Sequence, residues 1–359
     1  MSKGNSNIQS LEIDKLLAFQ RLELQFSPGI TVIIGANSTG KTHLMKLAYA
    51  MLRALGEYRN NAVDQVEGVK RPHITNKLLS VFRPDDREVG RLVYRTVGQA
   101  SGSATLKFSG KGSFYVGITR KGAVKRRFAG EPPPAIFIPS REVLSIYPGF
   151  IAAYEGRELA FDETYYDLCK ALSAAQLRGP REKKAAALID PLLSVLGGRI
   201  ALEPSGFKLK SKKTGSLEAP LLSEGFRKLG TLAHMIANGS LTSQSVLFWD
   251  EPEANLNPRL VTVMAKMLRN LASSGTQIII ATHDFLLSQE LSLAAEHEIE
   301  PNVPMSFVAL SRDEKGNVEC QSAPTLVELK DNPILAEFAA HYDREQNLIL
   351  AETSVKEDK

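Results

Sequence analysis

The stretch Gly35–Thr42, with the sequence Gly-Ala-Asn-Ser-Thr-Gly-Lys-Thr, constrains this chain more than any other. It follows the apolar, β-branched run Ile30–Ile34 and precedes His43–Leu55, where apolar residues recur at helical spacing. A glycine-rich loop between a buried strand and a helix lets successive backbone N–H groups and the helix N-terminus face phosphate groups. The spacing and both flanking elements therefore predict a nucleoside triphosphate site rather than a plain turn.

Each position of this loop has an expected role. Lys41 would reach the terminal phosphates, and the hydroxyl group of Thr42 would be a ligand of Mg²⁺. The expected nucleotide-binding residues are Gly35, Ala36, Asn37, Ser38, Thr39, Gly40, Lys41 and Thr42.

Adjacent acids follow a second apolar run, Val246–Trp249. In an open parallel sheet, ligands bind at the carboxyl ends of the strands, which is where Asp250 and Glu251 would lie. Asp250 can hold Mg²⁺ directly or through water. Glu251 is then free to orient the attacking water and to accept its proton. Two acids after a strand can equally cap a helix, but their place after a phosphate-binding loop favours hydrolysis.

Two more motifs narrow the class. Leu222–Lys228 opens a helix before Asp250, and Thr282–Asp284 ends the following strand. The order of motifs resembles the ATP-binding-cassette (ABC) superfamily from Ile13 to Asp284: a P-loop, a signature with the core Ser-x-Gly, a Walker B pair, a D-loop at Ala254–Pro258 and a switch histidine, His283.

This resemblance implies an α/β fold, ATP with Mg²⁺, and a head-to-tail homodimer that buries each ATP between two subunits. The signature residues Ser223, Glu224 and Gly225 of one copy would complete the site of the other, and His283 would contact the γ-phosphate or the water. Local alternatives remain open. His283 could cap a helix, and Ser223 with Glu224 could be an ordinary N-cap and first-turn acid.

The signature departs from that of transport ATPases, because Glu224 replaces its first glycine and the stretch from Lys41 to Ser223 is long. The pattern instead resembles the RecF, chromosome-maintenance (SMC) and OLD-type ATPases, which act on DNA or in phage defence. Long heptad runs for coiled-coil arms and the acid cluster of a Toprim nuclease are not found in the sequence. The glutamine that follows a strand in this class is also missing, and Ser140 or Glu142 is expected in its place.

The length of 359 residues allows one large or two ordinary cores. We expect an α/β, ABC-type P-loop ATPase lobe from residues 1–58 and 221–359, with an inserted antiparallel β and helical lobe at 59–220. The insertion divides into a β-meander at 88–130, whose first strand is expected at the alternating run Leu92–Tyr94, a helical part at 143–198 and a basic hairpin at 199–219. Two distant cysteines, Cys169 and Cys320, suggest neither a disulfide framework nor a zinc site.

No apolar run approaches the ~18–20 residues that span a bilayer. We therefore expect no direct membrane insertion, and the two distant cysteines fit a reducing, cytoplasmic location.

Positive charge is concentrated in one segment. Residues 88–130 hold nine Lys or Arg and the single acid Glu88, although the net charge of the whole chain is only +4. Such a field favours a polyanionic partner. Nucleic acid bound through basic residues of the range 107–127, a protein partner and a solvated hairpin face all stay open.

The leading hypothesis is an ATP-gated dimeric switch in anti-phage defence or DNA maintenance that controls a separate effector. A higher oligomer built from such dimers is left open. The alternatives are a DNA-binding clamp or repair ATPase and, less favoured, the ATPase subunit of a transporter.

Overall fold

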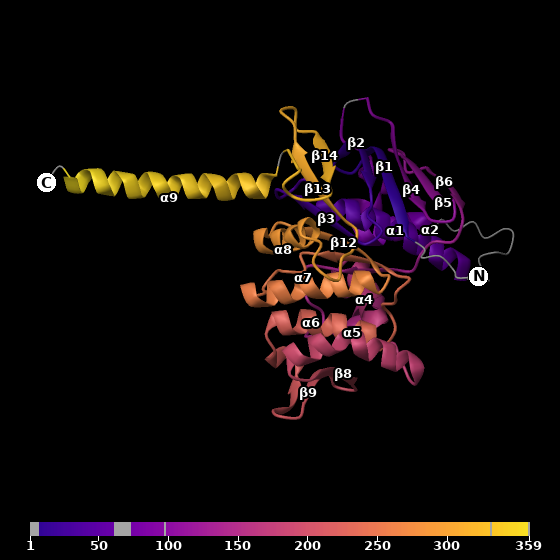
Figure 1. Cartoon of the computed structure of the whole chain (residues 1–359). Coiled ribbons are helices and arrows are strands. Elements are labelled where there is room, and N and C mark those ends of the chain that lie inside the picture. Colours follow the sequence, from indigo (N-terminus) through magenta and orange to yellow (C-terminus); the bar gives the residue numbers. More distant parts are fainter. Residues whose placement is uncertain (1–6, 61–72, 97, 331, 358–359) are drawn as a thin grey trace.

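The computed structural model describes residues 7–357 except 61–72, 97 and 331 (Figure 1). Its centre is a six-stranded sheet of order β14-β13-β3-β12-β11-β7. Neighbouring strands are parallel except for the antiparallel pair β13 and β14. The strands are β3 (Ile30–Gly35), β7 (Ala135–Ile138), β11 (Val246–Asp250), β12 (Gln277–Thr282), β13 (Met305–Arg312) and β14 (Val318–Ala323).

A second, antiparallel sheet of five strands lies beside this one, in the order β2-β1-β4-β5-β6. Its strands show the alternation of a sheet with one covered face, for example buried and half-buried residues in turn along β5. They are β1 (Ile8–Leu16), β2 (Phe19–Gln25), β4 (Ser101–Phe108), β5 (Gly112–Thr119) and β6 (Val124–Ala129).

Two hydrophobic cores cover the two faces of the central sheet. On one face, α1 (Lys41–Asn60) packs with α2 (His73–Phe82) and the antiparallel sheet, and buries residues such as Ile33 of β3. On the other face, Val32 of β3 packs with the helical part of the chain. Consecutive residues of β3 therefore face different cores, and this explains why the strand is apolar throughout.

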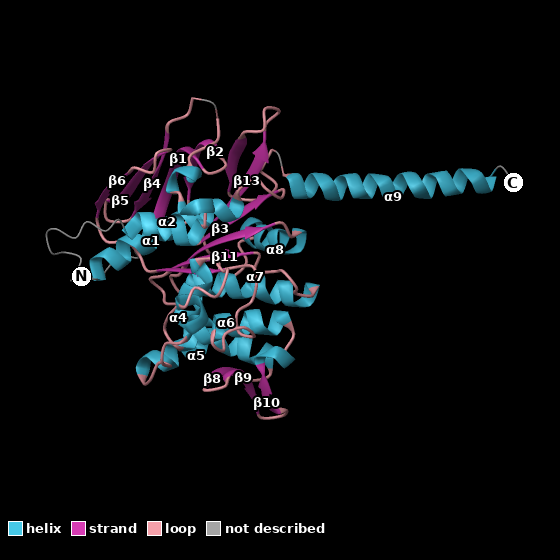
Figure 2. Ribbon diagram, turned by 180° about the vertical axis from the view of Figure 1, so that it is seen from behind, coloured by secondary structure: helices cyan, strands magenta, loops and turns pink. Residues whose placement is uncertain are grey.

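The helical part lies below the central sheet in Figure 1 and ends in a small sheet of order β10-β9-β8 (Figures 1 and 2). The first of its helices precede this small sheet: α3 (Phe150–Glu155), α4 (Glu163–Leu172) and α5 (Pro180–Leu196). The strands are β8 (Arg199–Glu203), β9 (Gly206–Ser211) and β10 (Gly215–Glu218). The later helices are α6 (Glu224–Ala237), α7 (Pro258–Ser273) and α8 (Phe285–Glu296).

The C-terminal helix α9 (Pro333–Glu357) projects away from the body of the molecule (Figure 1). Near its start, the ring of Phe338 stacks on Phe285 at the beginning of α8, with 4.1 Å between ring centroids. Across the described residues, no helix combines the length and apolar character needed to cross a membrane.

A buried amide holds the two large sheets together. Gln277, at the start of β12, accepts a hydrogen bond from the N–H of Ile8 at 2.8 Å. Its side-chain amide donates to the carbonyl oxygens of Ile8 and Ser27 at 2.9 and 2.8 Å. The side chain therefore satisfies backbone groups of the antiparallel sheet from within the central one.

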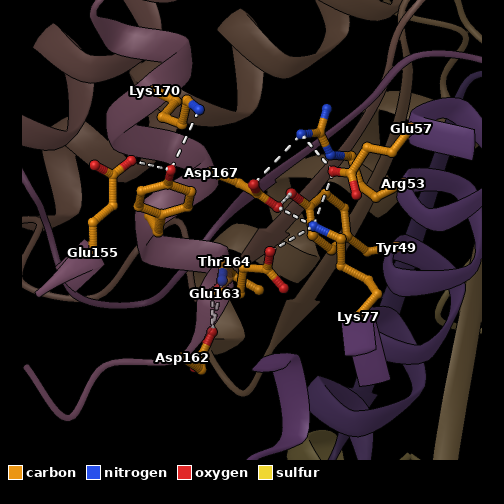
Figure 3. A network of polar contacts seen from close by, with 11 residues as sticks. Tyr49, Arg53, Glu57, Lys77, Glu155, Asp162, Glu163, Thr164, Asp167 and Lys170 are labelled. Carbon is orange, nitrogen blue, oxygen red and sulfur yellow. Dashed lines mark hydrogen bonds and ion pairs between the residues drawn. The ribbon is translucent and has the colours of Figure 1, made fainter. Parts of the chain in front are cut away.

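Polar side chains also connect the P-loop helix α1 to α4 (Figure 3). The Tyr49 hydroxyl donates to Asp167 at 2.7 Å, and the Lys77 ammonium of α2 lies 3.2 Å from the same carboxylate. Lys77 also pairs with Glu57 and Glu163 at 3.0 Å each. Burial opposes the charge of Lys77, yet these three carboxylates together raise its pKa.

The α/β class expected from the sequence is confirmed, and one local prediction within it is wrong. The alternating run Leu92–Tyr94 was expected to be a strand, but Val89–Leu92 form a 3₁₀ helix followed by an isolated bridge from Val93 to Leu16. Gly90 explains the difference, because its backbone lies so close to the Arg120 carbonyl that an added Cβ would be 2.2 Å from that oxygen.

The strand pairings also bear on the expected insertion at 59–220. Strands β4–β6 continue the sheet begun by β1 and β2, and β7 forms an edge of the central sheet. The insertion therefore shares its sheets with the flanking segments, and its proposed boundaries stay a prediction. Residues 61–72, near the start of this insertion, lie outside the described residues.

Candidate nucleotide site

The loop between β3 and α1 has the backbone of a phosphate-binding loop. Ser38 and Gly40 take left-handed conformations, with φ of 65° and 96°. Gly40 also packs against the ring of Phe19, where a Cβ would lie 2.8 Å from a ring carbon. Glycine is thus needed at this position both for its φ and for the close approach.

Lys41 lies folded over this loop. Its ammonium donates to the carbonyl oxygens of Gly35 and Ala36 at 2.7 and 3.0 Å. Burial lowers its pKa, while the nearby carboxylates, chiefly Glu251 and Asp250, act in the opposite direction. The Lys41 ammonium can therefore exchange these two carbonyl oxygens for an anionic ligand, and the loop can stay folded.

Thr42 and Asp250 meet although they are far apart in the chain. The Thr42 hydroxyl lies 3.0 and 2.9 Å from the two carboxylate oxygens of Asp250. Burial raises the pKa of Asp250, and the hydrogen bond from Thr42 opposes that rise. These hard oxygen atoms beside the P-loop match the ligands that Mg²⁺ takes in nucleotide sites, so the residues present fit this ion.

Glu251 and His283 form a second pair at the same edge of the sheet. His283 Nδ1 lies 3.2 Å from Glu251 Oε1, and both side chains keep access to solvent. Glu251 has a φ of 50°, uncommon for a residue with a side chain, and its N–H donates to the Ala281 carbonyl of β12. Such a backbone persists only where the surroundings hold it.

The P-loop and Glu251 line one pocket of about 460 Å³. The P-loop and the start of α1 form one side, and Glu251 of the Walker B pair forms another. Its lining consists of Ala18, Asn37, Ser38, Gly40, Lys41, Thr42, His43, Glu251 and Arg312.

The signature residues occupy a different place. Ser223 is the N-cap of α6 and accepts a hydrogen bond from the N–H of Phe226 at 3.4 Å, and Glu224 lies in the first turn. Ser223 is exposed, whereas Gly225 is buried against Leu256 of the expected D-loop. The N-cap interpretation thus describes the geometry, and a role toward the nucleotide of another subunit stays a prediction.

Glu142, considered as a substitute for the missing glutamine, is engaged elsewhere. Its carboxylate lies 2.8 Å from Arg227 Nε of α6 and accepts a hydrogen bond from the Ser145 N–H at 3.2 Å. These contacts tie the strand-end loop at 140–142 to the signature helix.

Three further residues near the site were not singled out from the sequence. Arg312, at the end of β13, lines the pocket and donates to the Ser38 carbonyl at 2.6 Å. Lys228 of α6 donates to the Glu251 carbonyl at 3.1 Å, and burial lowers its pKa. Burial raises the pKa of Glu253 to about 7, while the Thr282 hydroxyl donates to it at 2.6 Å. Arg312 lies outside all of the sequence motifs, whereas Lys228 ends the signature stretch Leu222–Lys228 and Glu253 follows the Walker B pair.

Comparisons with known proteins agree with this geometry. Residues 123–288 match the family described as "AAA domain, putative AbiEii toxin, Type IV TA system". The chain is 29% identical over 168 residues to a Nod factor export ATP-binding protein I of Burkholderia pseudomallei, which covers 47% of each chain. It is 41% identical over 54 residues to the DNA replication and repair protein RecF of Bacillus velezensis, or 15% of each. The chain thus spans less than half of either relative.

A solved SMC head bound to the C-terminal winged-helix domain of ScpA has a similar fold. The TM-score is 0.54 at 13% sequence identity, and the match covers 89% of this chain and 98% of the other.

The fold and the nucleotide site define an ABC-class P-loop ATPase. Within that class, the fold is shared with SMC heads, and a short stretch of the chain is similar to RecF.

Proposed function

We propose that the chain is an ATP-hydrolysing dimeric switch in which each nucleotide is held between two copies. One observation carries this proposal: the P-loop and Glu251 of the Walker B pair line one pocket, whereas Ser223 is exposed at the start of α6 and is not among the residues that line it. The nucleotide site of a single chain thus lacks its signature, and a second copy can supply it.

The residues of the pocket have distinct tasks. The N–H groups of the P-loop and Lys41 bind the phosphates, and Thr42 with Asp250 holds Mg²⁺, which when bound offsets the negative charge of the phosphates. Glu251 orients the attacking water and accepts its proton. His283 holds the Glu251 carboxylate in place through the contact at 3.2 Å.

Binding of ATP closes the dimer and hydrolysis reopens it, so the nucleotide state can be transmitted to a separate effector. The matched family description names a toxin system, and RecF is a replication and repair protein. We propose a role in anti-phage defence or DNA maintenance in the cytoplasm, and the likeness to RecF supports the second of these roles.

The variant Glu251→Gln tests this proposal. Loss of the general base should leave ATP bound and the dimer closed, so that a two-chain mass persists in size-exclusion chromatography with light scattering when ATP and Mg²⁺ are present. Hydrolysis by this variant at the wild-type rate would refute the assignment of Glu251.

A DNA-binding clamp is the second candidate, favoured by one patch of the antiparallel sheet. The Arg127 guanidinium lies 5.0 Å from the centre of the Tyr115 ring, and Lys125 is exposed on the same edge strand, β6. Other basic residues are occupied: Lys107 pairs with Glu12, and Arg120 donates to backbone carbonyls. Retention of DNA that falls steeply with salt, and is lost in Lys125→Ala/Arg127→Ala, would favour the clamp.

The remaining alternative, a transporter subunit, predicts co-purification with a membrane protein. The likeness to the export ATP-binding protein supports it, and the departure of Glu224 from the transporter signature opposes it.

A further inference from the structure

The start of α6 is in contact with the Walker B segment of the same chain. Lys228, in the second turn of the helix, is almost fully buried at 2% exposure. Its ammonium donates to the carbonyl oxygen of Glu251 at 3.1 Å. A buried lysine is costly unless its charge is compensated, so a position this close to the site calls for an explanation.

The acceptor of this bond is a strained residue. The Glu251 carbonyl also accepts from the Ala254 N–H at 3.1 Å, and the Glu251 N–H donates to Ala281 at 2.9 Å. Three hydrogen bonds from three segments thus surround one residue with a φ of 50°. Of the three residues that form these hydrogen bonds with Glu251, only Lys228 belongs to the signature helix α6.

The same helix touches the D-loop one turn earlier. A Cβ on Gly225 would lie 2.7 Å from Leu256 Cδ2, so the backbone of α6 packs directly on this loop. A shift of α6 therefore moves both the loop after Glu251 and the donor that binds the Glu251 carbonyl. Packed elements transmit such shifts because tight interfaces do not deform continuously.

We propose that Lys228 is a positioning residue through which the signature helix sets the backbone of Glu251 and so the direction of its carboxylate. The inference rests on the proposed function, in which Glu251 is the base and Ser223 meets the nucleotide of a second copy. The inference adds a connection within each chain. Helix α6 would link the nucleotide of the second copy, which Ser223 contacts, to Glu251, the base that acts on the nucleotide of its own chain.

Lys228 could also simply offset the nearby carboxylates, and the test separates the two roles. Lys228→Met in the full chain removes the donor but keeps an unbranched side chain that is only one atom shorter. We expect kcat for ATP hydrolysis to fall about 10- to 100-fold, because small misplacements of a catalytic group have effects of this size. KM and the dissociation constant of a fluorescent ATP analogue should change less than about 3-fold, since the phosphate contacts remain.

Thr231→Val is the matched control. Thr231 is buried on the same helix, but its hydroxyl donates only within α6, to the Arg227 carbonyl at 2.9 Å. This variant should keep the wild-type kcat. If it loses as much as Lys228→Met, general damage to α6 explains the result and the inference fails.

A double variant gives the sharpest outcome. In the Glu251→Gln background, the residual turnover should change less than about 2-fold on adding Lys228→Met, because there is no base left to position. An equal loss in both backgrounds, or a wild-type kcat for Lys228→Met, overturns the inference. Hydrolysis by Glu251→Gln alone at the wild-type rate overturns the proposed function instead.

If Lys228→Met does not fold, as judged by circular dichroism, Lys228→Arg replaces it. Arginine keeps the charge but moves the donor. A reduced kcat with unchanged ATP affinity supports positioning, and a wild-type kcat contradicts it.

Discussion

The Lys41 ammonium donates a hydrogen bond to the Gly35 carbonyl at 2.7 Å, across the P-loop that separates the two residues. The lysine thus lines the pocket with its charge directed to its own loop. A phosphate group is a stronger acceptor than a carbonyl, so an incoming nucleotide would take over this donor.

Lys41→Ala should abolish binding of ATP. The variant removes the cation that would meet the terminal phosphates, and we expect the dissociation constant for a fluorescent ATP analogue to rise at least about 100-fold, or ~2.7 kcal/mol. Unchanged thermal unfolding would show that the loop itself is intact. An ATP affinity equal to that of the wild type would remove the argument based on the P-loop.

Glu253 should make stability depend on pH. Burial raises its pKa from 4.5 to about 7, so the folded chain binds this proton more tightly than the unfolded chain. Its contribution is complete below about pH 4.5 and is lost as the pH rises through about 7, by ~3 kcal/mol at most. Glu253→Gln, which stays neutral, should therefore gain stability relative to the wild type over this range in urea unfolding.

The matched control for this experiment is Glu345→Gln, which changes an exposed carboxylate on α9. Its unfolding free energy should run parallel to that of the wild type. If the unfolding free energy of Glu253→Gln also ran parallel to that of the wild type, Glu253 would be ionised in both the folded and the unfolded chain over this pH range.

The polar network between α1, α2 and α4 should contribute to stability. Lys77 is 3% exposed and lies within 3.2 Å of carboxylates of Asp167, Glu163 and Glu57 (Figure 3). Lys77→Met leaves these acids without their shared cation, which we expect to cost about 3 kcal/mol in the free energy of unfolding. Lys170→Met on the exposed side of α4 should change it by less than about 0.5 kcal/mol. Equal effects of the two variants would show that the network adds no net stability.

The parts of the site that could be predicted from sequence are those encoded by neighbouring residues. The P-loop backbone and the acids at the end of β11 each follow from a local pattern of apolar residues and glycine. The proximity of Thr42 and Asp250 could be predicted because the carboxyl ends of parallel strands meet at one edge of the sheet.

The other features of the fold and the site depend on tertiary contacts that no local sequence pattern predicts. Gln277 looks like an ordinary polar residue at the start of a strand, yet its amide satisfies backbone groups about 250 positions away. Arg312 likewise reaches the P-loop from a strand about 270 positions away. The alternation of Leu92–Tyr94 predicted a strand because the close approach of Gly90 to Arg120 is a tertiary contact.

The shared site between two copies can be tested by mixing two inactive variants. Lys41→Ala lacks a working P-loop, and Ser223→Arg blocks the exposed start of α6, so neither chain alone can build a complete site. A mixed dimer pairs the intact P-loop of one chain with the intact signature of the other. We predict that equimolar mixing restores ATP hydrolysis to about a quarter of the wild-type rate per chain, the statistical share of complete sites. Full activity of Ser223→Arg alone, or no recovery on mixing, would contradict a nucleotide site shared between two copies.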